Sequence, residues 1–220
     1  KKINNKIATK IIKWRWLVAR DGLTNLETLK KFYLENKNWP HQNKIKEKIE
    51  AKISISNDKV EMLWFQDNPP KSGIGKIKLA EMLIKNSFNS EGYWLLNEAW
   101  KEHTFSFSEE KYIMSKFKNK ISKDSHNHRM EELIWNRSWG SARRQLKRVS
   151  NDVKLFSTAK IYLSRRRGNV DNAIKKVPKK YLLSESLVYE RVKWRRRAKL
   201  EKSSFELLLS YQGKITKPDK

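Results

Sequence analysis

The sequence predicts an all-α protein, an α-solenoid or α-α superhelix built from antiparallel helix pairs. Three observations predict this class: apolar residues recur at helical spacing, turn-forming residues are scarce, and one helix-pair layout occurs twice near the C-terminus. Only 7 Gly and 5 Pro occur in 220 residues, too few for a sandwich or barrel with many tight turns. No run of residues alternates in the manner of a half-buried strand.

Helical spacing is visible along most of the chain. Apolar residues return every three or four positions, as at Leu79 and Met82, which places them on one face of a helix. The pattern predicts about a dozen helices of roughly 8–17 residues. Pro40, Pro69–Pro70 and Pro178 are expected to lie between helices.

Several helix starts carry a recognisable cap. In a capping box, the first side chain and the one three residues later each bond the other's free backbone N–H group. Single Ser side chains can also cap a first turn. Two boxes and two single caps are expected, at Thr24–Glu27, Ser106–Glu109, Ser122 and Ser184.

A helix-pair layout recurs at the C-terminal end. Residues 181–209 read as a helix, a break near residues 198–201, and a second helix. Earlier in the chain, residues 159–167 end another helix on an arginine triplet, Gly168–Asn169 breaks it, and the next helix begins at Val170. Helix pairs repeated in this way bury their apolar faces against neighbouring pairs. The arginines at corresponding places are therefore expected to belong to a surface.

The net charge of +26 is the strongest compositional feature. Between residues 136 and 180 there are 14 Lys or Arg and only two acidic residues, Asp152 and Asp171. Such clustering attracts polyanions. Two alternatives stay open: a solvated outer face, and a genome composition that enriches Lys together with Ile and Asn.

Composition also excludes several classes. A hydrophobic fraction of 38%, with 9 Trp, 7 Tyr and 8 Phe, can fill a core, so the chain is not a disordered basic tail. Most of the Trp residues are expected in helix–helix packing. No run approaches 18 apolar residues, so no membrane span is expected. The absence of Cys excludes thiol chemistry, disulfides and cysteine-ligated zinc.

Catalytic, metal-binding and cofactor motifs are not found. His126 and His128 lack a third ligand at helical spacing, so no metal site is predicted. The segment 73–76, Gly-Ile-Gly-Lys, lacks the spacing of a phosphate loop and is expected to form a rigid turn into a helix near Lys76. Glu185–Ser186 is expected in a helix start. No catalytic residue and no cofactor are assigned.

Six groups of residues nevertheless follow one another in an order typical of a known family. They are Asn38-Trp39-Pro40; Met62-Leu63-Trp64-Phe65 with Asn68-Pro69-Pro70, Gly75 and Leu79-Ala80; Ala99-Trp100 with Glu109-Glu110; His128-Arg129-Met130 with Leu133-Ile134-Trp135; Ala142-Arg143-Arg144; and Tyr189-Glu190-Arg191 with Trp194-Arg195-Arg196-Arg197. Over roughly residues 10–210 the series resembles the helical superhelix of the soluble lytic murein transglycosylases of Gram-negative bacteria, most closely the alphaproteobacterial branch.

The resemblance implies a periplasmic scaffold that acts on peptidoglycan. Residues 1–220 would form a single superhelical domain, truncated at both ends, that guides glycan strands to a separate lysozyme-like domain. In the family that domain cleaves between N-acetylmuramic acid and N-acetylglucosamine with one glutamate and no metal, leaving a 1,6-anhydromuramoyl end. Its glutamate stands in a Glu-Ser motif followed by a Gly-Leu-Met-Gln-type segment. No such segment follows Glu185–Ser186 here, so the chain alone is expected to be inactive. The first residue, Lys1, is expected to follow a processed or missing segment.

Arg191, Arg195 and Arg196 are the predicted contacts for anionic groups of the substrate, the carboxylates of muramoyl peptides. The alternative role is an exposed helix face with ion pairs such as Glu190 to Lys193. Two other functions stay open, a basic helical nucleic-acid-binding module and a protein-interaction module. The charge with interleaved aromatics favours nucleic acid, but no helix-turn-helix glycine, zinc ligand set or RNA-recognition motif is present.

Overall fold

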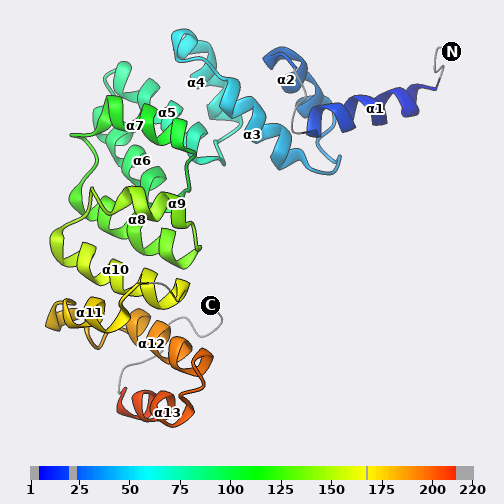
Figure 1. The fold of residues 1–220 in the computed structure, drawn as a ribbon. Coiled ribbons are helices and arrows are strands. Elements are labelled where there is room, and N and C mark those ends of the chain that lie inside the picture. The colour runs from blue at the N-terminus through cyan, green and yellow to red at the C-terminus, as the bar shows by residue number, and fades with distance from the viewer. Residues whose placement is uncertain (1–4, 20–23, 167, 212–220) are drawn as a thin grey trace. The chain divides into compact units, whose positions relative to one another are not determined.

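The computed structural model describes residues 5–19, 24–166 and 168–211, and all regular structure in these ranges is helical (Figure 1). The helices are α1 (Lys6–Val18), α2 (Leu26–Glu35), α3 (Gln42–Lys52), α4 (Asp58–Asp67), α5 (Gly73–Lys85), α6 (Asn89–Glu102), α7 (Phe107–Phe117), α8 (Lys123–Trp135), α9 (Trp139–Gln145), α10 (Asn151–Arg165), α11 (Val170–Lys175), α12 (Glu185–Arg197) and α13 (Glu201–Ser210). Short 3-10 turns, η1 (Ile55–Asn57) and η2 (Lys179–Tyr181), complete the set. The predicted all-α class is confirmed. The shortest helix has 6 residues and the longest 15.

The chain divides into two compact units, residues 1–121 and residues 122–220. Each unit has its own apolar clusters, and each is described by itself. The single superhelical domain expected over residues 1–220 stays a prediction.

The N-terminal unit is built around α5, which contributes to two apolar clusters. On one side, Met82 packs with residues of α1 to α4 such as Leu29 and Ile49. On the other, Ile77 packs with α6 and α7, where Trp100 is fully buried and stacks on Phe105 with ring centroids 5.7 Å apart. A helix that shares its surface between successive neighbours is the packing expected of stacked helix pairs.

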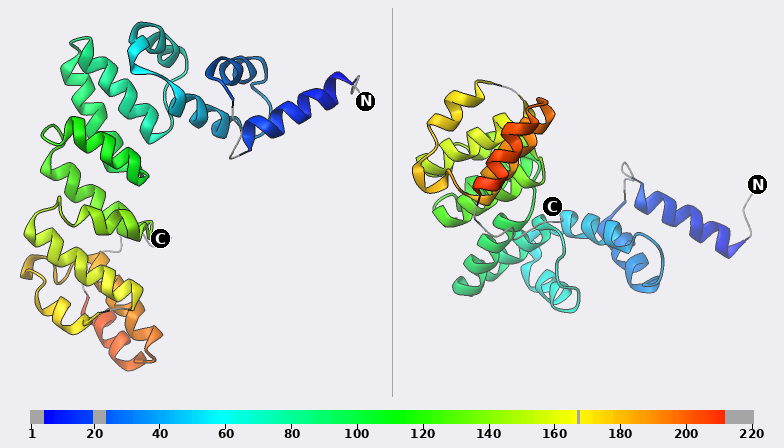
Figure 2. Two further views of the ribbon diagram at one scale, coloured as in Figure 1. Left: turned by 45° about the horizontal axis from the view of Figure 1, so that its top comes forward. Right: turned by 90° about the horizontal axis from the view of Figure 1, so that it is seen from below.

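The C-terminal unit contains three helix pairs, α8 with α9, α10 with α11, and α12 with α13. Helix α10 packs on α8 and also on α12, so the first helices of the three pairs follow one another (Figures 1 and 2). Val153 of α10 joins the cluster of α8 and α9, whereas Phe156 and Leu163 join the cluster of α11 and α12. The layout predicted for residues 181–209, and the break at Gly168–Asn169, are confirmed. Arg167 lies outside the described residues.

The same tight turn joins three helix pairs, α5 with α6 in the N-terminal unit and α8 with α9 and α12 with α13 in the C-terminal unit. After α5, α8 and α12 the chain passes through one left-handed residue, Ser87, Arg137 or Lys199, with φ of 70°, 54° and 60°. The next residue has φ between −78° and −95° and ψ near 60°, and the second helix starts directly after it. In each turn the residue after the left-handed one donates its N–H to a carbonyl five residues earlier, which is the Schellman pattern.

A small buried residue lies in the second helix of each of these pairs. A Cβ at Gly92 would lie 2.9 Å from the carbonyl oxygen of Ala80. At the corresponding place Ser204 donates its hydroxyl to the carbonyl oxygen of Val192, at 3.2 Å, and Ala142 is fully buried. The small side chains allow the two helices of a pair to approach closely.

Two of the predicted caps are confirmed and two are corrected. The Ser106–Glu109 capping box is complete, and Ser122 accepts from the N–H of Ser125. The box at Thr24–Glu27 is wrong, because Asn25 accepts from the N–H of Thr28 and α2 begins one residue later. Ser184 occupies the N-cap position of α12, but its side chain makes no capping hydrogen bond.

Candidate functional site

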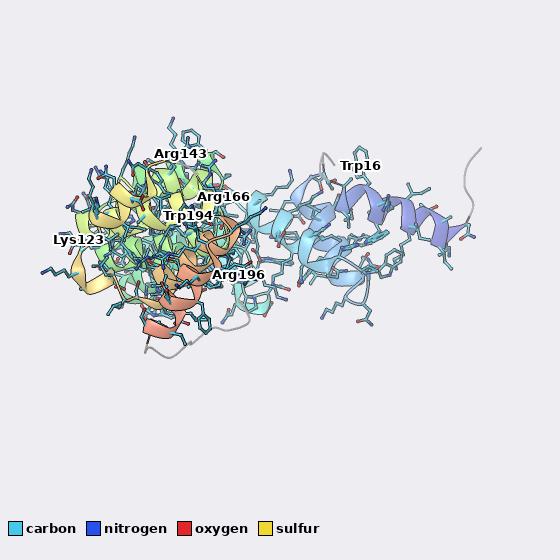
Figure 3. The ribbon with its side chains drawn as sticks, turned by 60° about the horizontal axis from the view of Figure 1, so that its bottom comes forward. Trp16, Lys123, Arg143, Arg166, Trp194 and Arg196 are labelled. Carbon is cyan, nitrogen blue, oxygen red and sulfur yellow. The ribbon has the colours of Figure 1, made fainter. Side chains whose placement is uncertain are left out.

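The three predicted arginines are not on one surface. Helical rotation places Arg191 and Arg195 on the same face of α12, where they line a cavity of about 330 Å³ beside α10 and α11. Arg196 is exposed and lines a different cavity, of about 670 Å³, between α12 and α13. Figure 3 labels Arg196 together with Trp194, which packs against the apolar cluster of α10, α11 and α12. The proposed binding role of the three arginines stays a prediction.

One of the three arginines, Arg195, makes a hydrogen bond within the fold. Arg195 Nη1 donates to the carbonyl oxygen of Ser203 at 2.9 Å and so links α12 to α13. Burial, and secondarily the charge of Arg195, lower the pKa of the half-buried Arg191 guanidinium. Arg196 is therefore the member of the set most open to a soluble anion.

A third cavity, of about 220 Å³, lies where the C-terminal end of α8 meets α10 and α12. We call it the Glu190 cavity; it is lined by Ile134, Trp135, Asn136, Arg137, Lys160, Ser186, Tyr189, Glu190 and Lys193. Two of its walls are aromatic. The rings of Trp135 and Tyr189 have centroids 6.3 Å apart and planes inclined by 40°, and 40% of the Tyr189 side chain is exposed.

The carboxyl of Glu190 is the unusual polar group of this cavity. Its Oε2 atom is buried and has no hydrogen-bond partner among the described residues. Burial raises the pKa of the Glu190 carboxyl, while nearby cations, Lys193 first and then Lys160 and Arg137, oppose that rise. A buried carboxylate oxygen without a donor is costly, so this atom favours a partner that can donate a hydrogen bond.

The cations around Glu190 already have other contacts. Lys193 lies 4.9 Å over the centroid of the Tyr189 ring and donates to its hydroxyl at 3.2 Å, so the predicted Glu190–Lys193 ion pair is wrong. Lys160 is buried and forms an ion pair with Glu131. Because these ammonium groups are held elsewhere, they shape the cavity's potential without satisfying Glu190 Oε2.

Other lysines stabilise the ends of helices. Lys48 donates to the carbonyl oxygen of Leu17 at 2.7 Å, near the end of α1. Lys78 donates to the carbonyl oxygens of Glu50 and Ile53, at 3.1 and 2.8 Å, at the end of α3. Cations there satisfy unpaired carbonyls and oppose the helix dipole. Some of the positive charge is therefore structural.

The Gly-Ile-Gly-Lys segment is a helix start and not a turn before one. Helix α5 begins at Gly73, with Ser72 as its N-cap, so the predicted start near Lys76 is wrong. The carboxylate of Glu50 accepts hydrogen bonds from the N–H groups of Lys71 and Ser72, at 2.9 and 2.7 Å. A side chain of the protein thus takes the donors that a phosphate would use.

His126 is likewise structural. It is buried in α8, and Gln145 Nε2 lies 3.2 Å from its Nδ1 and donates to its carbonyl oxygen at 2.9 Å. Burial, and secondarily Arg148 and Arg129, lower the pKa of His126 to about 4. Within residues 5–19, 24–166 and 168–211, no three His, Asp or Glu side chains are grouped so that they could hold a metal ion. In the same ranges no helix is long and apolar enough to cross a membrane.

From the sequence alone, Trp135 and Tyr189 are named only as parts of a family pattern, Glu190 is named also in an ion pair, and the three residues are not grouped. Their meeting depends on the packing of α8, α10 and α12, which the local pattern does not specify. Compared with known proteins, the chain matches no protein-family model, no curated protein and no solved structure.

Proposed function

We propose that this chain is a non-catalytic helical scaffold of a periplasmic lytic transglycosylase, which guides peptidoglycan strands to a separate lysozyme-like domain. The observation that carries the proposal is where the family-like residues lie. Trp100, Arg129 and Ala142 are fully buried, and so is Ala80 beside the close approach of Gly92. These four residues therefore belong to helix packing, which is what a resemblance to a scaffold would preserve, whereas others of the series, such as Leu63 and Tyr189, are exposed.

The repeated turn supports the same proposal. In the C-terminal unit, α8 and α12 are the first helices of two pairs joined by this turn, and both pack on α10, whose Val153 and Phe156 belong to the two apolar clusters. Stacks of this kind present extended surfaces to long ligands. A glycan strand with peptide carboxylates is a long ligand that cationic and aromatic side chains can contact.

The test compares two polymers under one condition. The purified chain is mixed with peptidoglycan sacculi or with duplex DNA at the same, moderately high salt, and the bound fraction is measured. We expect retention by sacculi and loss from DNA, because binding driven by counterion release weakens steeply with salt. A tight DNA complex that survives physiological salt would replace this proposal with the nucleic-acid module.

Two variants that lose the same number of positive charges test whether the three arginines form the surface that binds sacculi. Arg191, Arg195 and Arg196 are changed together to Gln, and in a control the exposed Lys44, Lys118 and Lys123 are changed to Gln. Both variants lose three positive charges. We expect weaker sacculus binding only from the arginine variant, with an unchanged helical spectrum. Because Arg195 links α12 to α13, the single Arg196→Gln variant is measured as well.

A further inference from the structure

We propose that the Glu190 cavity is a saccharide-binding site that takes one pyranose ring of a neutral glycan. This inference rests on the proposed function, because it names the part of the peptidoglycan strand that one site would recognise. The site lies wholly within the C-terminal unit, between α8, α10 and α12.

The size of the cavity limits what it can hold. At about 220 Å³ it is smaller than the roughly 300–1,000 Å³ typical of sites for drug-sized ligands. One ring-sized group fits this volume, with the rest of a polymer remaining outside. Tyr189 is partly exposed, so the cavity is open to such a chain on that side.

The aromatic walls favour a ring with apolar faces. Trp135 and Tyr189 stand at 40° to each other, so they do not form the parallel pair that would enclose a flat base. A pyranose ring is puckered and presents C–H groups to an aromatic surface and hydroxyl groups around its edge. Aromatic side chains with one apolar face and one polar end suit such mixed surfaces.

The charges argue against an ionic ligand. An ammonium group entering the cavity would meet Lys193, Lys160 and Arg137, whose charges reach Glu190. A fully ionised phosphate would bring no hydrogen-bond donor to the Glu190 carboxyl. A neutral ligand with hydroxyl or amide groups avoids the repulsion and supplies donors. Its oxygens accept from the amide of Asn136 or the guanidinium of Arg137. Because Oε2 of Glu190 is buried and unpartnered, the carboxyl has to turn toward the cavity to accept from the ligand's donors.

Heteronuclear NMR of the isotope-labelled full chain provides the test, with the β-1,4-linked trimer of N-acetylglucosamine as the probe. We expect saturable shifts of the Trp135 indole N–H signal. Tyr189→Ala and Glu190→Ala should each weaken binding by at least about tenfold. Trp94→Ala is the control, because Trp94 is 66% exposed and lies in the other unit; it should leave the affinity unchanged.

Three results would overturn the inference. They are the absence of shifts up to the solubility limit of the trimer, equal affinity in the Tyr189→Ala and control variants, and displacement of the trimer by inorganic phosphate. The sacculus assay separates this failure from that of the proposed function: sacculus binding with no trimer binding removes only the saccharide site. Circular dichroism confirms that each variant is folded, and Tyr189→Ala, at an exposed position, keeps the test decisive if Glu190→Ala unfolds.

Discussion

Gly75→Ala should destabilise the protein although alanine is the better helix former. A Cβ at Gly75 would lie 2.8 Å from Cδ and 3.0 Å from Cβ of Glu50, both inside van der Waals contact. Glu50 is fully buried, and its carboxylate holds the N–H groups of Lys71 and Ser72. The new methyl group therefore has to push the carboxylate away from these donors.

The size of the effect follows from the contacts that are lost. A hydrogen bond to a charged group contributes about 1.5–3 kcal/mol, and losing one or both at Glu50 costs roughly 2–5 kcal/mol. The helix preference of alanine over glycine offsets at most about 1 kcal/mol. We expect the free energy of unfolding to fall by about 1–4 kcal/mol, measured by urea denaturation followed by circular dichroism.

Two comparisons make this expectation refutable. Gly140→Ala introduces the same methyl group where the nearest atom, Nη1 of Arg144, is 3.7 Å away, so it should be neutral or slightly stabilising. In a Glu50→Ala background the carboxyl group is gone and only the Cβ contact at 3.0 Å remains, so Gly75→Ala should then cost much less. Equal costs with and without Glu50 would show that this contact is not the cause.

Three further outcomes are expected. As the pH is lowered from 6.5 to about 4, the free energy of unfolding of the C-terminal unit should fall by at most roughly 3 kcal/mol. The cause is His126, which stays neutral in the folded state but takes a proton in the unfolded state. His126→Gln should flatten this pH dependence, and His128→Gln should not. Lys199→Gly should raise the free energy of unfolding by up to about 1 kcal/mol, because φ is 60° there, whereas Lys202→Gly inside α13 should lower it by about 1 kcal/mol. The purified chain should release no anhydromuropeptides from sacculi, because no Gly-Leu-Met-Gln-type segment follows Glu185–Ser186; product above a buffer control would contradict this.

The features predicted well were local ones. Helix spacing, the prolines between helices and the Ser106–Glu109 box depend on residues within one or two turns, so the sequence contains their causes. The turns after α5, α8 and α12 could not be predicted in this way. Ser87, Arg137 and Lys199 stand where glycine would be expected, because the packing of the paired helices, and not residue preference, enforces the left-handed conformation.

The candidate site shows the same limit. Arg191, Arg195 and Arg196 were grouped by their closeness along the chain, but rotation of about 100° per residue separates neighbours on a helix. Arg191 and Arg195, four positions apart, share a cavity, and Arg196 faces another. The ion pair predicted for Glu190 failed for a different reason. The aromatic ring of Tyr189 competes for Lys193, and a charge pattern alone does not reveal that competition.

The contacts of individual lysines show that part of the net positive charge has a structural role. Lys48 and Lys78 stabilise helix ends, and Lys160 is paired with Glu131 inside the C-terminal unit. A groove that follows a polyanion is lined by free cations, yet the cavity with two aromatic walls has the buried carboxyl of Glu190 among its cations. A phosphate ion has no hydrogen-bond donor for this carboxyl, whereas a neutral sugar ring has several. High positive charge and recognition of a neutral saccharide are therefore compatible in this chain, with the charge acting at the surface and the selectivity residing in the cavity.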